Sequence, residues 1–255
     1  MITFKNISRL AVLMFIILMI SSFFVNIPFL WYVFVFSVWL VITMIGSFSP
    51  GWNFHLKSFT SNPNISTKKI AITFDDGPHP VITLKVLKLL DDYNAKATFF
   101  CIGQQVEKHP EVLQLITNKG HQTGNHSYSH NYFIDFKNTQ GWITELKRTD
   151  DVMEKITGSK PTLFRPPFGV TTPHLAKAVK ASGHHVIAWN IRSFDTVLKN
   201  PEAILKRLSH KIKPGSVILL HDNHPKIEYI LEHLLQFLQE NGYQMVTINQ
   251  LLHEK

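Results

Sequence analysis

The sequence predicts an α/β domain built on a parallel sheet, preceded by a helical membrane hairpin or anchor. Two observations lead to this prediction. In this chain of 255 residues, the stretch from Leu10 to Leu56 contains no Asp, Glu, Lys or Arg. From Lys68 onward, short apolar runs alternate with amphipathic segments, as in parallel sheets covered by helices. We therefore expect an anchor over residues 1–50, a linker over 51–67 and a folded domain over 68–255.

The uncharged stretch holds two apolar runs, Leu10–Val25 and Phe29–Ile45, separated by Asn26-Ile27-Pro28. A bilayer span needs about 20 mostly apolar residues, so the stretch is too long for one span and fits two short spans joined by a tight turn. Lys5 and Arg9 before the first run favour a cytoplasmic amino terminus. A hairpin that starts in the cytoplasm also returns there.

Other arrangements of this stretch stay open at the level of sequence. Residues 1–25 can be a secretory signal, although they lack a cleavage site of the usual small-x-small type. One run can span the bilayer while the other lies in the interface, or the hairpin can be inserted with both ends outside. The alternative without a membrane is a buried helical hairpin in a soluble protein.

The net charge of +8 is unevenly distributed, and this indicates the partner. Five of the 26 basic residues lie within residues 1–74, which contain no acid, so the other 21 are nearly balanced by the 18 acids. Most of the excess flanks the apolar stretch, where cations favour anionic lipid headgroups. Because no basic stripe is interleaved with aromatic residues, we expect membrane lipid as a partner and no nucleic acid.

Seven short apolar runs predict strands, and polar or amphipathic segments follow them. The predicted strands are 70–74, 97–101, 121–124, 163–165, 185–189, 216–220 and 244–247. Helices are predicted over 81–93, 104–118, 139–157, 173–181, 201–211 and 226–240. A barrel of about seven strands and an open doubly wound sheet both fit this order. In either fold, side chains that follow the strands meet at the carboxyl ends of the sheet.

The single cysteine, Cys101, lies at the end of one of these apolar runs. A lone cysteine excludes an intrachain disulfide and a cysteine-based zinc finger. We expect it to be a buried core thiol and not a nucleophile.

Two adjacent carboxylates, Asp75 and Asp76, stand where the first predicted strand meets Gly77-Pro78. Neighbouring strand residues point to opposite faces, but a turn can bring both side chains to one pocket. Two close anions are costly unless a cation lies between them or one is protonated. The alternative interpretation is a turn whose Asp caps the helix predicted over 81–93.

Two imidazoles follow in His126-Ser127-Tyr128-Ser129-His130, four residues apart. One helical turn, or a loop close to it, aims both at one point, which is common for zinc ligands. With Asp76 as the third ligand, they would form a two-histidine, one-carboxylate site with open positions for water. Because the chain has 14 histidines, a chance pair is the alternative.

Three further side chains follow predicted strands. Arg165 leads the rigid turn Arg165-Pro166-Pro167-Phe168-Gly169 and can clamp a carboxylate with two hydrogen bonds. His221 ends a buried strand and suits general acid catalysis. Asp195 lies on a loop and can orient a histidine. Taken singly, these residues are also typical of a surface ion pair, a helix cap and a loop acid.

Together and in this order, the motifs resemble those of the polysaccharide deacetylase family (the NodB homology domain, carbohydrate esterase family 4). The resemblance covers about Lys68 to Leu252 and rests on TFDDGP at 73–78, HSYSH at 126–130, RPPFG at 165–169 and Leu-x-His at 219–221. It implies a distorted (β/α) barrel. It also implies that Asp76, His126 and His130 bind one divalent metal, most often Zn²⁺, with Co²⁺ and Mn²⁺ as alternatives.

The resemblance also implies roles for the remaining residues. Asp75 would be the general base held by Arg165, and His221 the general acid tuned by Asp195. Pro167, Phe168, Gly169 and Leu219 would contact substrate, with a backbone N–H near Phe168 stabilising the oxyanion. The fourth family motif differs here, because Ser193-Phe194-Asp195-Thr196 lacks a usual Trp and Asn190 replaces a frequent acid.

The function implied is metal-dependent removal of N-acetyl groups from a polysaccharide that contains N-acetylglucosamine, releasing acetate. Given the anchor, cell-envelope peptidoglycan is expected, or a chitin-like glycan, with the catalytic domain outside the cytoplasm. An O-acetyl esterase acting on xylan or another glycan shares the mechanism. Alternatives of another class are a membrane-tethered glycan-binding module with a dead site and a membrane scaffold.

Overall fold

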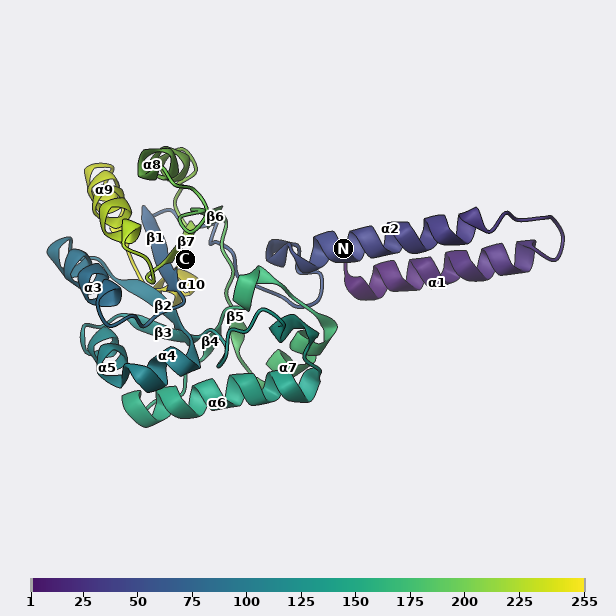
Figure 1. Ribbon diagram of the computed structural model, residues 1–255. Helices are drawn as coiled ribbons and strands as arrows, with labels where there is room; N and C mark the ends of the chain where they lie inside the picture. The colour runs from purple at the N-terminus through teal and green to yellow at the C-terminus, as the bar shows by residue number, and fades with distance from the viewer. Residues whose placement is uncertain (1, 255) are drawn as a thin grey trace.

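Parallel strands form the core of the computed structural model, which describes residues 2–254 (Figure 1). Their order is β5-β4-β3-β2-β1-β7-β6, with β8 beside the start of β1, and every ladder between them is parallel. The sheet curves into a half-barrel whose two edge strands are β5 and β6. The strand bounds are β1 Lys69–Asp75, β2 Ala97–Cys101, β3 Gln122–Asn125, β4 Leu163–Phe164, β5 His185–Val186, β6 Ile191–Arg192, β7 Val217–His221 and β8 Gln244–Met245.

The strand predictions are confirmed, and the structure adds one strand. Each of the seven predicted runs overlaps a strand, while β6 has only two residues and no apolar run of its own. In β1, six of the seven residues are buried, as expected for a parallel strand covered on both faces. The register aligns Asp75 with His221 of β7, so these two predicted site residues end their strands at the same level.

Helices cover the sheet and connect its strands. Their bounds are α3 Ile82–Asp92, α4 Gly103–Lys108, α5 Pro110–Asn118, α6 Thr139–Thr157, α7 Pro173–Ser182, α8 Pro201–Ser209, α9 Lys226–Glu240 and α10 Ile248–Leu252, with short 3-10 turns η1 Pro50–Trp52, η2 Ile134–Phe136 and η3 Pro167–Gly169. The single helix predicted over 104–118 is wrong. It is divided into α4 and α5 at His109, because Pro110 cannot donate a backbone hydrogen bond to the preceding turn.

The segment 51–67, for which a linker is expected, lies along the folded domain. The backbone N–H of Phe59 donates to Val186 beside β5, and that of Asn62 donates to Gly215 before β7. Phe54 and Ile65 are buried. The segment therefore connects the hairpin to the domain without a free tether.

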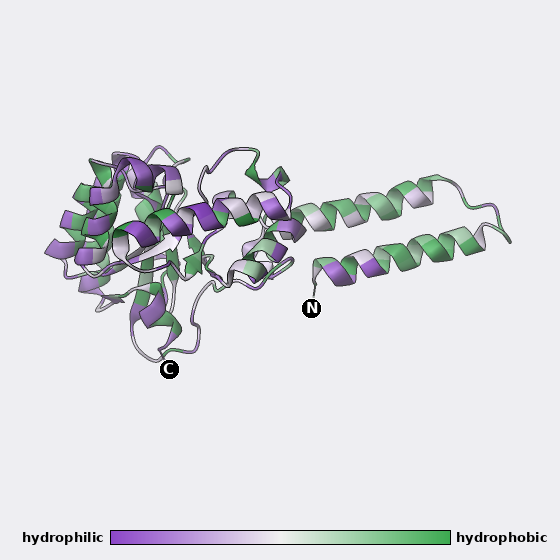
Figure 2. Ribbon diagram, turned by 90° about the horizontal axis from the view of Figure 1, so that it is seen from below, coloured by the Kyte–Doolittle hydropathy of each residue, from purple (hydrophilic) through white to green (hydrophobic). Residues whose placement is uncertain are grey.

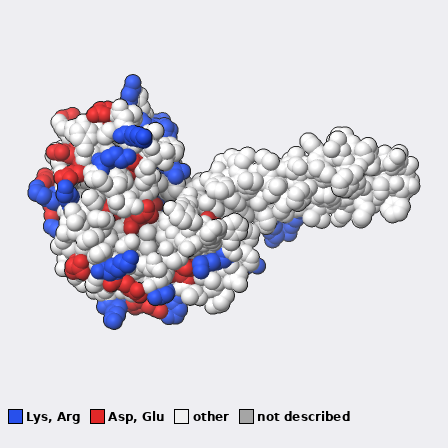
Figure 3. Space-filling model, viewed as in Figure 1, with Lys and Arg blue, Asp and Glu red and all other residues white. Residues whose placement is uncertain are grey.

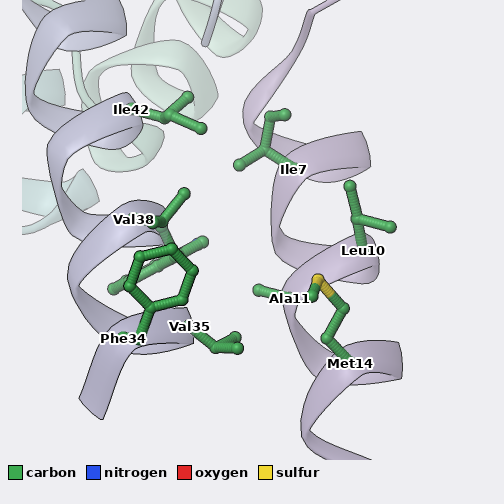
Figure 4. Close-up of a pocket in the computed structure, with 9 residues that line it drawn as sticks. Ile7, Leu10, Ala11, Met14, Phe34, Val35, Val38 and Ile42 are labelled. Atoms are coloured by element: carbon green, nitrogen blue, oxygen red, sulfur yellow. The ribbon is translucent and has the colours of Figure 1, made fainter. Parts of the chain in front are cut away.

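The amino-terminal part is a hairpin of two helices, α1 Phe4–Ser21 and α2 Leu30–Ser47, that projects from the domain. Each is long and apolar enough to cross a membrane. In Figure 2 most of both helices has the colour of hydrophobic residues, and on the face seen in Figure 3 the charged groups of the hairpin lie near its base. The helices pack along a shallow apolar cleft (Figure 4), which is lined by Ile7, Leu10, Ala11, Met14, Phe34, Val35, Val38, Trp39 and Ile42.

Burial separates the hairpin from a core helix of a soluble protein. Within the described residues, α1 has no buried side chain and α2 has only Val35 and Gly46. By contrast, α9 buries six residues against the sheet. The alternative of a buried helical hairpin is therefore wrong for this chain.

Candidate active site

A cavity of about 420 Å³ opens at the carboxyl ends of the central strands. Eight of the eleven predicted site residues line it, and Arg165, Asp195 and Pro167 are buried behind its wall. The lining residues are Asp75, Asp76, His126, His130, Tyr132, Phe168, Gly169, Trp189, Arg192, Thr196, Leu219 and His221.

The two adjacent carboxylates converge because the backbone turns between them. Asp75 is the last residue of β1, and Asp76 has a left-handed conformation with φ 77°. As a result, both face the same imidazole: His126 Nε2 lies 3.7 Å from Asp75 Oδ2 and 3.6 Å from Asp76 Oδ1. The possibility that they point to opposite faces is thereby excluded.

Asp76, His126 and His130 offer three ligand atoms that lie within 4.8 Å of one another. The Nε2 atoms of the histidines lie 3.6 Å and 3.4 Å from Asp76 Oδ1. Tetrahedral zinc with bonds of about 2.0–2.1 Å separates neighbouring ligand atoms by roughly 3.3 Å. The three groups are thus spaced for a shared cation, and two imidazoles with one carboxylate are a donor set that suits Zn²⁺ and similar divalent ions.

The protonation of these groups is set by their neighbours. Burial alone would lower the pKa of His126, but Asp75 and Asp76 raise it above its usual value. His126 Nδ1 contacts the backbone oxygen of Arg165 at 2.8 Å, which leaves Nε2 directed at the cavity. Burial and the neighbouring His126 lower the pKa of His130 to about 4, so its lone pair is free at neutral pH. Burial alone would raise the pKa of Asp76, but His126, His130 and His221 lower it to about 2.

The loop between the two histidines is held by groups outside the cavity. Ser127 and His130 have positive φ angles of 66° and 45°, which side-chain-bearing residues adopt at a cost. Glu145 of α6, which is buried, accepts hydrogen bonds from the backbone N–H groups of Tyr128 at 3.0 Å and Ser129 at 2.8 Å, and from the Ser129 hydroxyl at 2.9 Å. The carboxylate therefore satisfies two amides that the strained loop cannot pair itself.

Asn125, the last residue of β3, continues this support. Its side-chain oxygen accepts from Ser127 N at 2.8 Å, while its amide donates to Asp150 and to the backbone of Leu146. Helix α6 thus fixes the histidine loop at two points, through Glu145 and through Asn125.

Arg165 is fully buried and holds Asp75 with one hydrogen bond, not the expected two. Its Nη1 donates to Asp75 Oδ1 and to the Thr73 hydroxyl, both at 2.7 Å, while Nε and Nη2 donate to the backbone oxygens of Ile187 and Ala188. The carboxylate is oriented by its Oδ1 atom, and Oδ2 remains directed at the cavity.

His221 ends β7, on the other side of β1 from the histidine loop after β3, and lines the opposite wall of the cavity with Asp195 behind it. Asp195 Oδ1 lies 2.8 Å from His221 Nδ1, and Oδ2 accepts from the His221 backbone N–H at 2.8 Å. Burial alone would lower the pKa of His221, but the hydrogen bond and charge of Asp195, with Asp75 and Asp76 nearby, raise it to about 9. His221 and His224 in turn keep the pKa of Asp195 well below its usual value.

The aromatic rim of the cavity depends on a glycine. Phe168 has φ 56° and Gly169 has φ 70°, and a Cβ atom at Gly169 would lie 2.6 Å from the Trp189 ring. Only glycine fits against the Trp189 ring in this conformation. The Phe168 ring contacts the ring of His130 with a centroid distance of 4.6 Å, and Tyr132 stacks on Phe168.

Sequence reasoning did not assign several groups at this site. Trp189 ends a predicted strand, so the rule that strand ends carry the site would have found it. Asn223, which donates to Asp76 Oδ2 at 2.9 Å, follows the last motif closely. No sequence pattern marks Glu145, because its contact with the histidine loop depends on how α6 packs against that loop. Asn190 is structural: its side-chain oxygen accepts from Val217 N at 2.8 Å.

With this geometry established, comparison with known proteins identifies the family. Residues 62–187 match the family model described as polysaccharide deacetylase. The chain is 34% identical over 206 residues to a peptidoglycan-N-acetylglucosamine deacetylase of Bacillus cereus, which covers 76% of this chain and 92% of that protein. The chain belongs to the polysaccharide deacetylase family.

Two further relatives extend the comparison to solved structures. Peptidoglycan-N-acetylmuramic acid deacetylase PdaC of Bacillus subtilis is 35% identical over 195 residues, 76% of this chain and 40% of PdaC. The structure of PdaC superimposes with a TM-score of 0.69, covering 75% of this chain and 92% of the solved chain. A family 4 acetyl xylan esterase from Clostridium thermocellum, in complex with a cobalt ion, has 31% identity and a TM-score of 0.66, covering 72% and 90%. The chain spans well under half the length of PdaC.

Proposed function

We propose that this protein is a metal-dependent hydrolase that removes N-acetyl groups from an N-acetylglucosamine-containing glycan, either peptidoglycan or a chitin-like glycan, and releases acetate. The observation that carries the proposal is the convergence of three metal-ligand groups with a free carboxylate oxygen and a proton-donating imidazole in one cavity. A glycan-binding module would not need this combination. The names of the B. cereus and B. subtilis relatives support peptidoglycan as the polymer.

Asp76, His126 and His130 would hold the metal ion. When bound there, a divalent cation polarises the acetyl carbonyl and lowers the pKa of water toward about 7. Zn²⁺ is proposed because two imidazoles and one carboxylate are common zinc ligands, with Co²⁺ or Mn²⁺ as alternatives. The cobalt ion named with the xylan esterase structure supports a divalent ion at this kind of site.

Asp75 and His221, which flank the proposed metal site, transfer the protons. Asp75 accepts the proton of the attacking water on Oδ2, because Oδ1 is engaged by Arg165. His221 is protonated at neutral pH and gives its proton to the departing sugar nitrogen, which would otherwise leave as an unstable amide anion. Asp195 keeps the imidazolium oriented, and by the family resemblance a backbone N–H near Phe168 binds the oxyanion. Phe168, Gly169 and Leu219 would contact the acetylated sugar, with Pro167 holding the turn behind them.

We further propose that the hairpin anchors the enzyme in a membrane, with residues 68–255 as the catalytic domain. Support comes from two exposed apolar helices and from the basic residues at their base. We place the domain on the envelope side, where peptidoglycan lies. The charges of Lys5 and Arg9 favour the opposite side, so a pair of carboxyl-terminal reporter fusions, one active only in the cytoplasm and one only outside it, decides the orientation.

The decisive test is acetate release by the full chain from N-acetylated glycan, with Asp75→Asn as the key variant. We expect activity that a chelator abolishes and added Zn²⁺ restores. Asp75→Asn should keep stoichiometric metal and lose roughly 10²–10⁴-fold in turnover, because general base catalysis typically contributes that much. Near-native turnover by Asp75→Asn would contradict the assigned role.

The xylan esterase gives the second candidate, an O-acetyl esterase that uses the same site. Assaying acetate release from N-acetylated chitooligosaccharides, peptidoglycan fragments and acetylated xylan in parallel separates the two. Faster release from the ester substrate, at matched acetyl concentration, would favour the esterase.

A further inference from the structure

The hairpin is joined to the catalytic domain without a spacer. The backbone N–H of Thr171 donates to the oxygen of Ser47, the last residue of α2, at 2.9 Å. The N–H of Phe4, the first residue of α1, donates to Phe54 at 2.9 Å. A Cβ atom at Gly46 would lie 2.4 Å from the Phe54 ring, so the helix end and the domain are in close contact. Both helices therefore start or end directly at the domain.

The length of the hairpin then determines how far the domain lies from the bilayer. Each helix has 18 residues, or about 27 Å at a rise of about 1.5 Å per residue. The hydrocarbon core of a bilayer is about 30 Å thick. A hairpin of this length has no residues to spare for a stalk. If it is inserted, the face of the domain around Ser47 and Thr171 lies at the headgroup level.

An exposed aromatic segment, residues 131–137, lies on this same face. The segment precedes α6. The first residue of α6, Thr139, contacts His174 of α7 at 3.0 Å, and His174 lies three residues after Thr171, which contacts the end of α2. Figures 1 and 2 both show this end of α6 on the side from which the hairpin projects. Phe133 is 74% exposed and Phe136 is 86% exposed. An exposed apolar patch marks an interaction site, and Phe is among the residues that interfacial segments bury at the boundary between headgroups and acyl chains.

The charge of the face suits an anionic lipid surface. A groove at the hairpin base is lined by Lys5 and Lys57 together with apolar residues such as Phe54 and Pro173. Within residues 2–254, neither lysine has a salt-bridge partner. The one acid of the aromatic segment, Asp135, is partly buried, and burial raises its pKa to about 6. Lysines near a membrane surface are attracted to anionic headgroups.

We infer that the aromatic segment 131–137 is a second membrane contact, which rests on the bilayer beside the hairpin and holds the catalytic cavity at the membrane surface. This inference rests on the membrane insertion proposed above. The segment reaches the cavity through Tyr132, whose ring is parallel to that of Phe168 within 13° at 5.9 Å. The substrate favoured by this arrangement is an acetylated amino sugar presented close to the bilayer, such as a glycan attached to lipid.

The first test places single spin labels on the full chain in phosphatidylglycerol-containing vesicles. Cys101 is buried and stays unlabelled, so one cysteine is introduced at a time: Phe136→Cys in the segment, Ile17→Cys in the hairpin and Tyr229→Cys on α9 at the far side of the domain. We expect a water-soluble nickel chelate to reach label 229 freely, label 136 several-fold less and label 17 hardly at all. Equal access to labels 136 and 229, with label 17 protected, would overturn the inference.

The second test compares one N-acetylglucosamine oligosaccharide in two forms, attached to lipid in vesicles or free in solution. The double variant Phe133→Ser/Phe136→Ser should lose on the order of tenfold in kcat/KM on the lipid-attached form, because the contact raises the effective concentration there. Its activity on the free form should be unchanged, and Tyr229→Ser should match the native chain on both. An equal loss on both forms would mean that the segment binds glycan, and no loss on either would also overturn the inference.

These outcomes are separable from failure of the earlier proposals. A chain inactive on every acetylated substrate would contradict the hydrolase, while the spin labels still report the membrane contact. If label 17 is as accessible as label 229, the hairpin is not in the membrane and both the anchor and this inference fall.

Discussion

The two walls of the cavity use histidine in opposite ways. On one wall, His126 and His130 lie next to Asp76, and their free nitrogens point at a common position. On the other, His221 has its Nδ1 atom bonded to the buried Asp195, and its pKa is raised to about 9. The first wall gathers three possible ligand atoms around one position, which suits a cation, and the second presents a proton, which suits an acid.

The difference lies in how each carboxylate is placed relative to its imidazole. Asp76 approaches both histidines at 3.4–3.6 Å, too far for a good hydrogen bond and close enough to share an ion. Asp195 lies 2.8 Å from His221 Nδ1 on the side away from the cavity, and its negative charge favours the protonated ring. The same residue pair, His with Asp, thus gives a ligand set or a proton donor according to geometry alone.

Removing a ligand from the first wall should have the largest effect. His126→Ala takes away one of three ligand atoms, so we expect metal content near zero and turnover reduced by at least about 10³-fold, since both water activation and carbonyl polarisation depend on the ion. Metal analysis of the purified full chain and an acetate assay measure this. His233→Ala on α9, remote from the cavity, is the control. Retention of bound zinc by His126→Ala would contradict the ligand assignment.

Removing the acid of the second wall should reduce turnover without releasing metal. We expect His221→Ala to lose about 10²–10⁴-fold in kcat, the usual contribution of general acid catalysis. Its metal stoichiometry should equal that of the native chain. The two variants should therefore differ in metal content, which His126→Ala loses and His221→Ala keeps. A substrate with a better leaving group than an amine should lose less, because it needs the proton less. An equal loss on both substrates would assign His221 to binding.

Much of this site could be predicted from sequence because strand ends carry it. Asp75, His126 and His221 each follow an apolar run, and in a parallel sheet such positions meet at one edge. The parallel sheet followed from the alternation of strands and helices, whereas its curvature into a half-barrel was implied only by the family resemblance. The sequence could not distinguish the two walls, because the pattern of histidines and acids is similar in both and only the backbone decides which atoms face each other.

What could not be predicted depends on backbone strain and on packing between distant elements. The convergence of Asp75 and Asp76 depends on the left-handed conformation of Asp76, which no side-chain pattern reveals. Strand β6 has too few residues to form a periodic pattern. Glu145 lies inside an amphipathic helix, where an acid normally faces solvent, and it becomes structural only because α6 packs against the histidine loop.

Removing Glu145, which holds the histidine loop of the first wall from outside the cavity, should weaken metal binding without abolishing it. Glu145→Ala leaves two loop amides without an acceptor, and loss of such a supporting group typically costs about 10–100-fold in metal affinity. Glu145→Gln should restore most of the affinity, because both amides donate to the same oxygen, Oε2, which an amide oxygen can replace. Titration with Zn²⁺ and the visible spectrum of the Co²⁺ form measure this.

The control for this prediction is Glu154→Gln, an exposed acid on the same helix. If Glu145→Ala only lowered the melting temperature and left the zinc affinity and the cobalt spectrum unchanged, Glu145 would be a residue of the fold and not of the metal site.

The smallest effect is expected from changing the charge behind His221. Asp195→Asn keeps an oxygen near His221 Nδ1 but removes the negative charge that raises the pKa of the imidazole. The general acid must be protonated to act, so activity falls as pH rises through the pKa of His221. In the native enzyme this alkaline limb should lie at or somewhat below pH 9, since a bound cation lowers the pKa of a nearby imidazole. In Asp195→Asn the limb should move to lower pH, with about a tenfold loss of kcat at pH 8 and less at pH 6.

Asp151→Asn, an exposed partner of Lys147, should leave the pH profile unchanged and is the control. A limb that stays in place in Asp195→Asn would show that the second wall does not depend on this carboxylate for its proton, and the contrast between the walls would then rest on His221 alone.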